Sequence, residues 1–272
     1  MEYKGTKMTE KDYRECGALS RSDLWKIRES PEKFAYYMTH PEPQTESLLF
    51  GCVYHKLVLE PDDFENEYAV EINVDKRTKD GREQYSNWLA SIGDKTVVST
   101  KIYDKAVEMK EALSKSKLAM ALLNGEHECA YFWQDEDTGV QCKCRLDCLR
   151  ELNGKPLIVD LKTASTCETD KWIRDSIKYG YHMQVGMYSS GVAANYGVQP
   201  DFVFIVQEKE PPYSVNIFKS TAEYYNYGVD EFRSLIGLYK HCMDTNNWYG
   251  QMGENEQIND LTLPSWIGGG ND

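Results

Sequence analysis

The chain has 272 residues, of which 41% are hydrophobic and 28% are charged, and its formal net charge is −13. This length is sufficient for one large domain or two small ones. No stretch approaches the roughly 18 apolar residues that a membrane span requires, and the polar N-terminus lacks the apolar core of a signal peptide. We therefore expect a cytoplasmic protein, not bound to a membrane, whose eight cysteines are reduced.

The acidic balance bears on possible partners. Proteins that bind nucleic acid through its phosphates usually present a basic face, because release of counterions drives that binding. An acidic chain can still act on DNA where cations gather locally and a metal offsets clustered carboxylates. Composition alone thus argues against a nucleic-acid-binding protein, and only specific motifs can outweigh that argument.

The first part of the chain is predicted to be mainly helical. Ser20 or Ser22 can cap one helix, and Ser30-Pro31 can begin the next. A third, largely apolar helix is expected over residues 47–59. A short strand at 68–74, the polar stretch 75–84 and a long lysine-bearing helix at about 100–123 complete this part.

The following part is predicted to form a sheet. Strands are expected at 127–133, 140–149 and 156–162, helices at 168–178 and 181–195, strands at 202–208 and 213–218, and a helix from 221 to about 243. This order predicts an α/β (α+β) fold with a mixed central sheet flanked by helices.

We expect residues 1–250 to form a single domain, in which residues 19–125 are the mainly helical N-terminal part. Residues 126–245 would hold the sheet, its helices and the chemistry. Residues 251–272, rich in Gly, Asn and Asp, are predicted to be a flexible C-terminal tail.

Two acids and a lysine stand out on the predicted strands. Residues two apart in a strand share a face, so Lys143, Arg145 and Asp147 lie together on one strand, and Asp160 and Lys162 on the next. Two carboxylates and an amine in a half-buried place are costly unless something compensates them. A divalent cation held by Asp147 and Asp160 would do so. An isolated Asp-x-Lys is more often an ordinary salt bridge, so the surrounding motifs must decide.

Those motifs resemble the PD-(D/E)XK nuclease superfamily. Asp147, in the context Arg-Leu-Asp, matches the "PD" acid without its proline, and Asp160-Leu161-Lys162 matches the (D/E)-x-K element. Gln184 and Tyr188, on one face of the following helix, match the Gln-x-x-x-Tyr element of the RecB-like branch.

His55 extends the likeness upstream, because Gly51-Cys-Val-Tyr-His55 is similar to the Gly-x-x-x-His helix of that branch. Within the branch, the RecE-type (exonuclease VIII) family is most similar, over about residues 19–218. The likeness includes the segments LSRSDLWKIRESPEKFAYY, ECAYFWQDEDTGVQCKCRLD and DLKTA.

The resemblance implies a restriction-endonuclease-like core that binds Mg²⁺ or Mn²⁺, hard ions that suit oxygen ligands. The implied ligands are His55, Asp147, Asp160 and the backbone carbonyl of Leu161, with Glu128 as a further acidic ligand. Lys162 would orient or help deprotonate the attacking water, and Gln184 and Tyr188 would position the nucleophile or the strand. The candidate DNA contacts are Lys143, Arg145, Thr163 and His182.

Other cofactors are not expected. Cys142, Cys144 and Cys148 share one strand, where small buried hydrophobic residues belong, and the chain has no Cys-x-x-Cys pair. Related nucleases with an iron–sulfur cluster use four cysteines flanking the motifs, whereas only Cys167 and Cys242 lie downstream of the Asp-x-Lys element. The chain also lacks a GxxxxGK[ST] loop for ATP.

The resemblance implies a Mg²⁺-dependent exodeoxyribonuclease that digests one strand of linear duplex DNA from 5′ to 3′. It would leave 3′ single-stranded tails for phage-type recombination. Relatives form ring tetramers, which implies a homo-oligomer acting on double-stranded DNA ends with a single-strand annealing protein as a possible partner. The net charge and the missing proline keep open a non-catalytic DNA-end binding or assembly module on the same fold. A carboxylate-pair hydrolase such as a glycosidase would use Asp147 and Asp160 but leave Lys162 unexplained.

Overall fold

The computed structural model describes residues 4–40, 42–258 and 260–263. The N-terminal part contains α1 (Glu10–Glu15), α2 (Arg21–Glu29), α3 (Pro31–Thr39), α4 (Glu46–Leu59), a 3₁₀ turn (Pro61–Asp63), α5 (Phe64–Glu67), β1 (Tyr68–Val70), α6 (Lys79–Ile92), β2 (Thr96–Val98), α7 (Thr100–Ser114) and α8 (Lys117–Leu122). The second part contains β3 (Glu126–Gln134), β4 (Gln141–Leu152), β5 (Lys155–Ala164), α9 (Thr169–Lys178), α10 (Tyr181–Tyr196), β6 (Asp201–Glu208), β7 (Val215–Lys219) and α11 (Ala222–Thr245).

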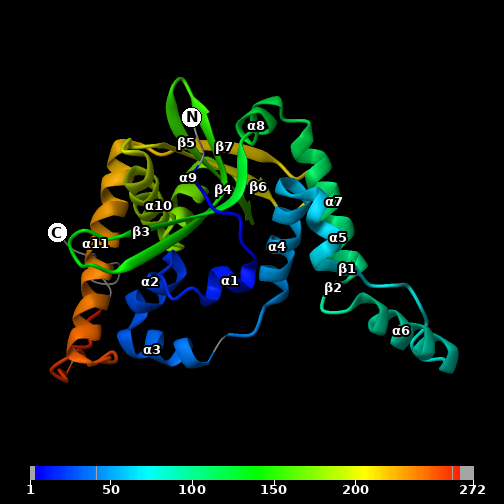
Figure 1. The fold of residues 1–272 in the computed structure, drawn as a ribbon, viewed down its shortest axis with the longest axis horizontal. Helices are drawn as coiled ribbons and strands as arrows, with labels where there is room; N and C mark the ends of the chain where they lie inside the picture. Colours follow the sequence, from blue (N-terminus) through cyan, green and yellow to red (C-terminus); the bar gives the residue numbers. More distant parts are fainter. Residues whose placement is uncertain (1–3, 41, 259, 264–272) are drawn as a thin grey trace.

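The main sheet has the strand order β3-β4-β5-β6-β7. Only β5 and β6 run parallel, and α9 and α10 form the crossover between them, as a parallel pair requires. The other neighbours are antiparallel. This arrangement confirms the predicted α/β fold with a mixed central sheet flanked by helices (Figure 1).

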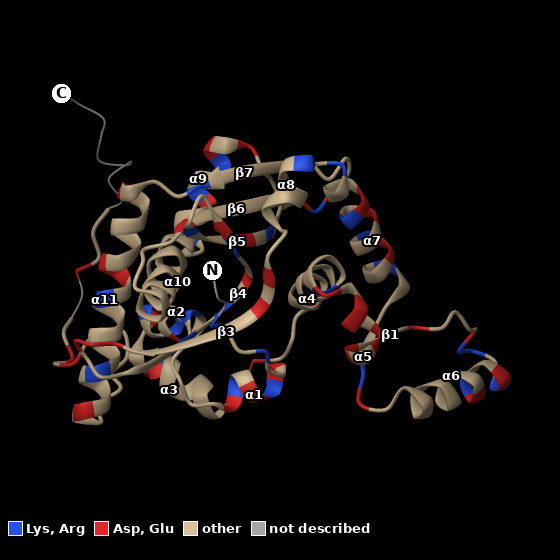
Figure 2. Cartoon of the chain, turned by 45° about the horizontal axis from the view of Figure 1, so that its top comes forward, with Lys and Arg blue, Asp and Glu red and all other residues tan. Residues whose placement is uncertain are grey.

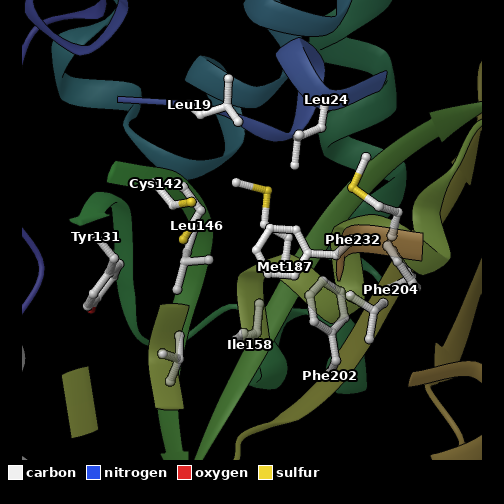
Figure 3. Close-up of a cluster of buried hydrophobic side chains, with 14 of the residues drawn as sticks. Leu19, Leu24, Tyr131, Cys142, Leu146, Ile158, Met187, Phe202, Phe204 and Phe232 are labelled. Atoms are coloured by element: carbon white, nitrogen blue, oxygen red, sulfur yellow. The ribbon is translucent and has the colours of Figure 1, made fainter. Parts of the chain in front are cut away.

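Helices cover both faces of the sheet, and each face has its own core. Helices α2, α10 and α11 pack on one face around Leu24, Met187 and Phe232, together with Ile158 of β5 (Figure 3). Helices α4 and α7 pack on the other face, where Leu161 of β5 is buried. Strand β5 is therefore apolar on both sides, which explains its nearly continuous hydrophobic run.

The predicted caps are present. Ser20 caps α2 in a reciprocal capping box with Asp23, and Ser30 caps α3, whose first residue is Pro31. The helix expected over 100–123 is divided, because Ser116 accepts a hydrogen bond from a backbone N–H and starts a new helix, α8. Neither α1 nor β2 was predicted from the sequence.

Of residues 75–84, predicted as a polar stretch, those from Lys79 onward form the start of an unexpected helix, α6. Thr78 caps this helix, which extends away from the main body between β1 and β2 (Figure 1). Acidic and basic residues are interspersed along α7, whereas those of α6 lie near its first turn (Figure 2). Among the described residues, none of the helices combines the length and apolar character that crossing a bilayer demands.

The proposed single domain and tail stay predictions. Part of the tail, residues 259 and 264–272, lies outside the described residues. Within them, Gln251 donates a hydrogen bond to the carbonyl of Glu29, and Glu254 pairs with His241 at 3.0 Å. The beginning of this segment is thus attached to the end of α2 and to α11.

Candidate metal centre and active site

The candidate site lies where β4 and β5 separate. Their ladder runs from Leu152–Lys155 to Cys148–Val159, and it ends just before Asp147 and Asp160. Strand β5 continues beside β6 as far as Ala164. At the separation, Asp147 Oδ2 accepts a hydrogen bond of 2.7 Å from the backbone N–H of Leu161, a group left unpaired by the departing strand. The two acids therefore occupy a fork in the sheet.

Three potential ligands gather on the open side of this fork. His55 comes from α4, Glu128 from β3 and Asp147 from β4, and one ligand atom of each lies within 4.8 Å of the others. The His55 Nδ1 and Asp147 Oδ2 atoms are 3.6 Å apart, and these two side chains are 24% and 14% exposed. We call these three residues the open group. One imidazole nitrogen and two carboxylates fit a divalent ion of the Mg²⁺ or Mn²⁺ type.

Glu128 has an unusual backbone. Its φ of 50° lies in the left-handed region, and the β3–β4 register shows no pairing between it and Asp147. A non-glycine residue in this region costs about 1–3 kcal/mol and is often found at functional sites. Burial, and then repulsion from Asp147, raise the pKa of Glu128 to about 8, although Arg145 opposes the rise. A bound cation would relieve this unfavourable charge.

Asp160, Lys162 and Gln184 form a second cluster, which we call the buried group. Asp160 is 2% exposed, and its Oδ1 accepts a hydrogen bond from Gln184 Nε2 of α10. Its Oδ2 contacts the ammonium of Lys162 as an ion pair, without the geometry of a hydrogen bond. Burial raises the pKa of Asp160 to about 6, with Lys162 opposing the shift.

Lys162 remains protonated in this setting. Burial acts to lower its pKa, but the carboxylates of Asp160 and Asp147 outweigh burial and raise it. The ammonium also lies 5.0 Å from the ring centroid of Tyr181, a favourable cation–π distance. The fork opens into a cleft lined by the open group and by Lys162. Tyr188, one turn beyond Gln184 on α10, also lines this cleft, and burial raises its pKa well above the usual value.

The structure thus divides the predicted ligand set. It brings His55 and Asp147 together and adds Glu128 directly beside them. Asp160 lies outside that group, and its two oxygens contact Gln184 and Lys162, so its role as a metal ligand stays a prediction. Leu161 lines the cleft, and a role for its carbonyl stays a prediction.

Two of the four candidate DNA contacts are contradicted by their burial. Lys143 is 4% exposed, and its ammonium donates to the carbonyl of Tyr13 at 2.6 Å. His182 is 1% exposed and pairs with Glu231 of α11. The alternation of side chains along the strand predicted Lys143 on the same side as Asp147, but the N-terminal segment covers Lys143. Neither side chain is available to a phosphate.

Arg145 and Thr163 do line the cleft. The Arg145 guanidinium lies 2.6 Å from a carboxylate oxygen of Glu10 and 3.0 Å from one of Glu128. Burial acts to lower the pKa of Arg145, but these two acids outweigh it and raise the pKa. Arg145 therefore stays charged at the edge of the open group.

Sequence reasoning missed the N-terminal wall of the cleft. Glu10 and Tyr13 of α1 line it, and Thr9 caps α1 by accepting a hydrogen bond from the N–H of Asp12. The pattern Thr9-x-x-Asp12 is a capping signal that was available in the sequence. The helix has only 6 residues, too few for the periodic pattern that revealed the longer helices.

The fold is that of a PDDEXK-like domain, the class to which PD-(D/E)XK nucleases belong. Residues 20–260 match the model of a family described as a PDDEXK-like domain of unknown function (DUF3799), and the chain belongs to this family. The membership confirms the restriction-endonuclease-like core and agrees with the RecE-type resemblance. It supports the assignment of this chain as a nuclease.

Solved structures agree with the fold. The crystal structure of a "Putative exonuclease" from Eubacterium rectale matches with a TM-score of 0.64 and 15% identity, over 98% of this chain and 100% of that chain. At this identity the likeness shows a shared fold alone. A second structure, of SSO0001, has a TM-score of 0.32 and 16% identity over 70% of this chain and 86% of that chain, which is too low to carry an argument. No curated protein matches the chain.

Proposed function

We propose that this protein is a metal-dependent DNA exonuclease that digests one strand of linear duplex DNA from 5′ to 3′. The observation that carries the proposal is the convergence of the open group with Asp160 and Lys162 at one fork in the sheet. The fork opens into a cleft of about 1800 Å³, larger than the roughly 300–1,000 Å³ typical of small-molecule pockets. Such a cleft suits a polymer.

The chemistry follows from the charges around the fork. His55, Glu128 and Asp147 would hold Mg²⁺ or Mn²⁺, which supplies a polarised phosphodiester and a water of lowered pKa. Lys162, kept protonated by Asp160, would orient the attacking water or stabilise charge on the phosphate. Gln184 fixes Asp160, and Tyr188 lines the path of the strand. Arg145 and Thr163 would contact the phosphates near the metal.

The role in recombination, the partner protein and the ring assembly rest on the resemblance to the RecE-type family. The 3′ tails would serve recombination together with a single-strand annealing protein, and the active form would be a ring of copies of this chain. These steps need DNA ends as substrate, and the partly exposed open group at the cleft is consistent with access by a strand.

One observation favours the alternative of a non-catalytic DNA-end binding module. Asp160 and Lys162 neutralise each other, and Asp160 lies outside the open group. If that pairing persisted with metal bound, the lysine would not reach the water. The family match leaves no comparable support for a glycosidase.

The test is the substitution Asp160→Asn, assayed by nucleotide release from end-labelled linear duplex with Mg²⁺ and with Mn²⁺. We expect a loss of at least about 100-fold, the scale of losing one charged group in a preorganised site, with the fold intact. Asp201→Asn is the matched control, because Asp201 pairs with Lys155 and Lys219 away from the cleft.

Undiminished digestion by Asp160→Asn would overturn the proposal. DNA binding by the wild-type protein without cleavage in either metal would favour the binding module instead. Labels placed at the 5′ and 3′ ends in separate substrates report the direction of digestion.

A further inference from the structure

The N-terminal segment passes over the edge of the candidate site. We call residues 4–9 the strap. Thr6 pairs with Ala130 of β3 through two backbone hydrogen bonds of 2.9 Å, and the N–H of Lys4 donates to the hydroxyl of Tyr196 at 2.7 Å. A Cβ on Gly5 would lie 2.6 Å from the Cβ of Cys129, so this close approach requires glycine. The strap is therefore seated on β3, two residues beyond Glu128.

The strap then reaches the opposite wall of the cleft. Lys7 forms an ion pair with Glu60, the C-cap residue of α4, which also carries His55. Beyond the strap, Glu10 of α1 contacts Arg145. In Figure 1 the dark blue segment runs from beside β4 to α1, which lies near α4.

These contacts form a closed ring that has His55 and Asp147 of the open group as one of its links and the strap as another. The strap is bonded to β3, β3 to β4, Asp147 of β4 is 3.6 Å from His55 of α4, and α4 is paired with the strap through Lys7. Lys7, Met8 and Thr9 line the same cleft as the open group. The strap also precedes residues 20–260, so it lies outside the part that matches the family.

We propose that the strap determines specificity for DNA ends. A strand with a free end can thread beneath the strap to the open group, whereas a closed strand can enter only after the strap leaves both β3 and α4. This inference rests on the proposed nuclease function, and it assigns the preference for ends to a segment of this chain that carries none of the candidate catalytic side chains.

Two substitutions detach the strap by different means. Gly5→Leu cannot fit against Cys129 and Tyr131, and Lys7→Glu places like charges on the strap and Glu60. The matched controls are on α11: Gly237→Leu, where an added Cβ meets nothing within 4 Å, and Lys240→Glu, which breaks the pair with Asp244. Thermal unfolding checks the fold, and faster tryptic cleavage after Lys11 reports a detached strap.

The assay compares circular and linear single-stranded DNA of the same sequence, with linear duplex as the reference. We expect both strap variants to keep linear digestion and to raise the rate on the circle, relative to the linear strand, about tenfold, which corresponds to about 1.4 kcal/mol. The controls should leave this ratio unchanged.

Variants with a detached strap that still ignore the circle would overturn the inference while leaving the nuclease proposal intact. Loss of linear digestion in folded strap variants would also overturn it, because the strap would then serve catalysis itself. Absence of digestion of the linear duplex by the wild-type protein would overturn both proposals, and digestion of the duplex without digestion of the linear single strand would overturn this inference alone.

Discussion

The open group and the buried group contain similar charges in opposite surroundings. In the buried group, Gln184 donates a hydrogen bond to Asp160 Oδ1 and Lys162 forms an ion pair with Oδ2, so the protein itself offsets part of the cost of burial. In the open group, two carboxylates and an imidazole face a cleft, and burial together with repulsion from Asp147 raises the pKa of Glu128 to about 8. The comparison shows that the protein itself provides partners for the charges of the buried group, whereas a cation from the solvent would compensate the charges of the open group.

The largest effect should be on metal binding, which we expect to involve the open group and not the buried group. Asp147→Asn removes a charge from the open group, so Mn²⁺ should no longer stabilise the protein against unfolding. The wild-type protein should gain about 2.7 kcal/mol when the ion is present at 100 times its dissociation constant. Thermal unfolding with and without Mn²⁺ measures this gain. An equal gain in Asp147→Asn would show that the ion binds elsewhere.

A smaller effect is expected within the buried group. Gln184→Leu leaves Asp160 Oδ1 without its donor, and a buried acceptor without a partner costs about 1–3 kcal/mol. Urea unfolding of the metal-free protein should show this loss, and nuclease activity should fall because Asp160 no longer has a fixed position. Gln84→Leu on the exposed side of α6 is the matched control. Stability equal to that of the wild type would mean that the Gln184 contact contributes nothing.

The pH dependence of the metal-free protein sharpens the same comparison. Because the pKa of Glu128 is about 8 in the folded state and near 4.5 when unfolded, the folded state binds more protons between these values. The free energy of unfolding should therefore fall as pH rises from about 4.5 to about 8, and stabilisation by Mn²⁺ should grow over that window. Unfolding measured with a chelator, for the wild type and Glu128→Gln, tests this. A Glu128→Gln profile identical to that of the wild type would contradict it.

The smallest effect is expected at Lys143. Because its ammonium is bonded to the carbonyl of Tyr13, Lys143→Met should leave the salt dependence of DNA binding unchanged. Arg145→Gln, at the cleft, should reduce the slope of log affinity against log salt by about 0.9, the value for one lost phosphate contact. Binding titrations in chelator measure both. A reduced slope in Lys143→Met would show that Lys143 does contact DNA.

The sequence predicted the main sheet well because its strands and turns are local signals. The strands near 127–133, 140–149 and 156–162 were placed within a few residues, and so were the helices that carry His55 and Gln184. Helix α6 was missed because it contacts little of the body and shows mostly polar residues. The break between α7 and α8 was missed because only the side chain of Ser116 marks it.

Residue types and their spacing are sufficient to identify the family, the order of the motifs and the acids, because spacing along a strand or helix is a local property. Which of these groups meet depends on the packing of the whole chain. This packing placed Glu128 beside His55 and Asp147, gave Asp160 to Gln184 and Lys162, and buried Lys143 beneath the N-terminal segment. These outcomes depend on where β4 leaves β5 and on what packs over the fork, and contacts between distant parts of a chain leave no periodic trace in its sequence.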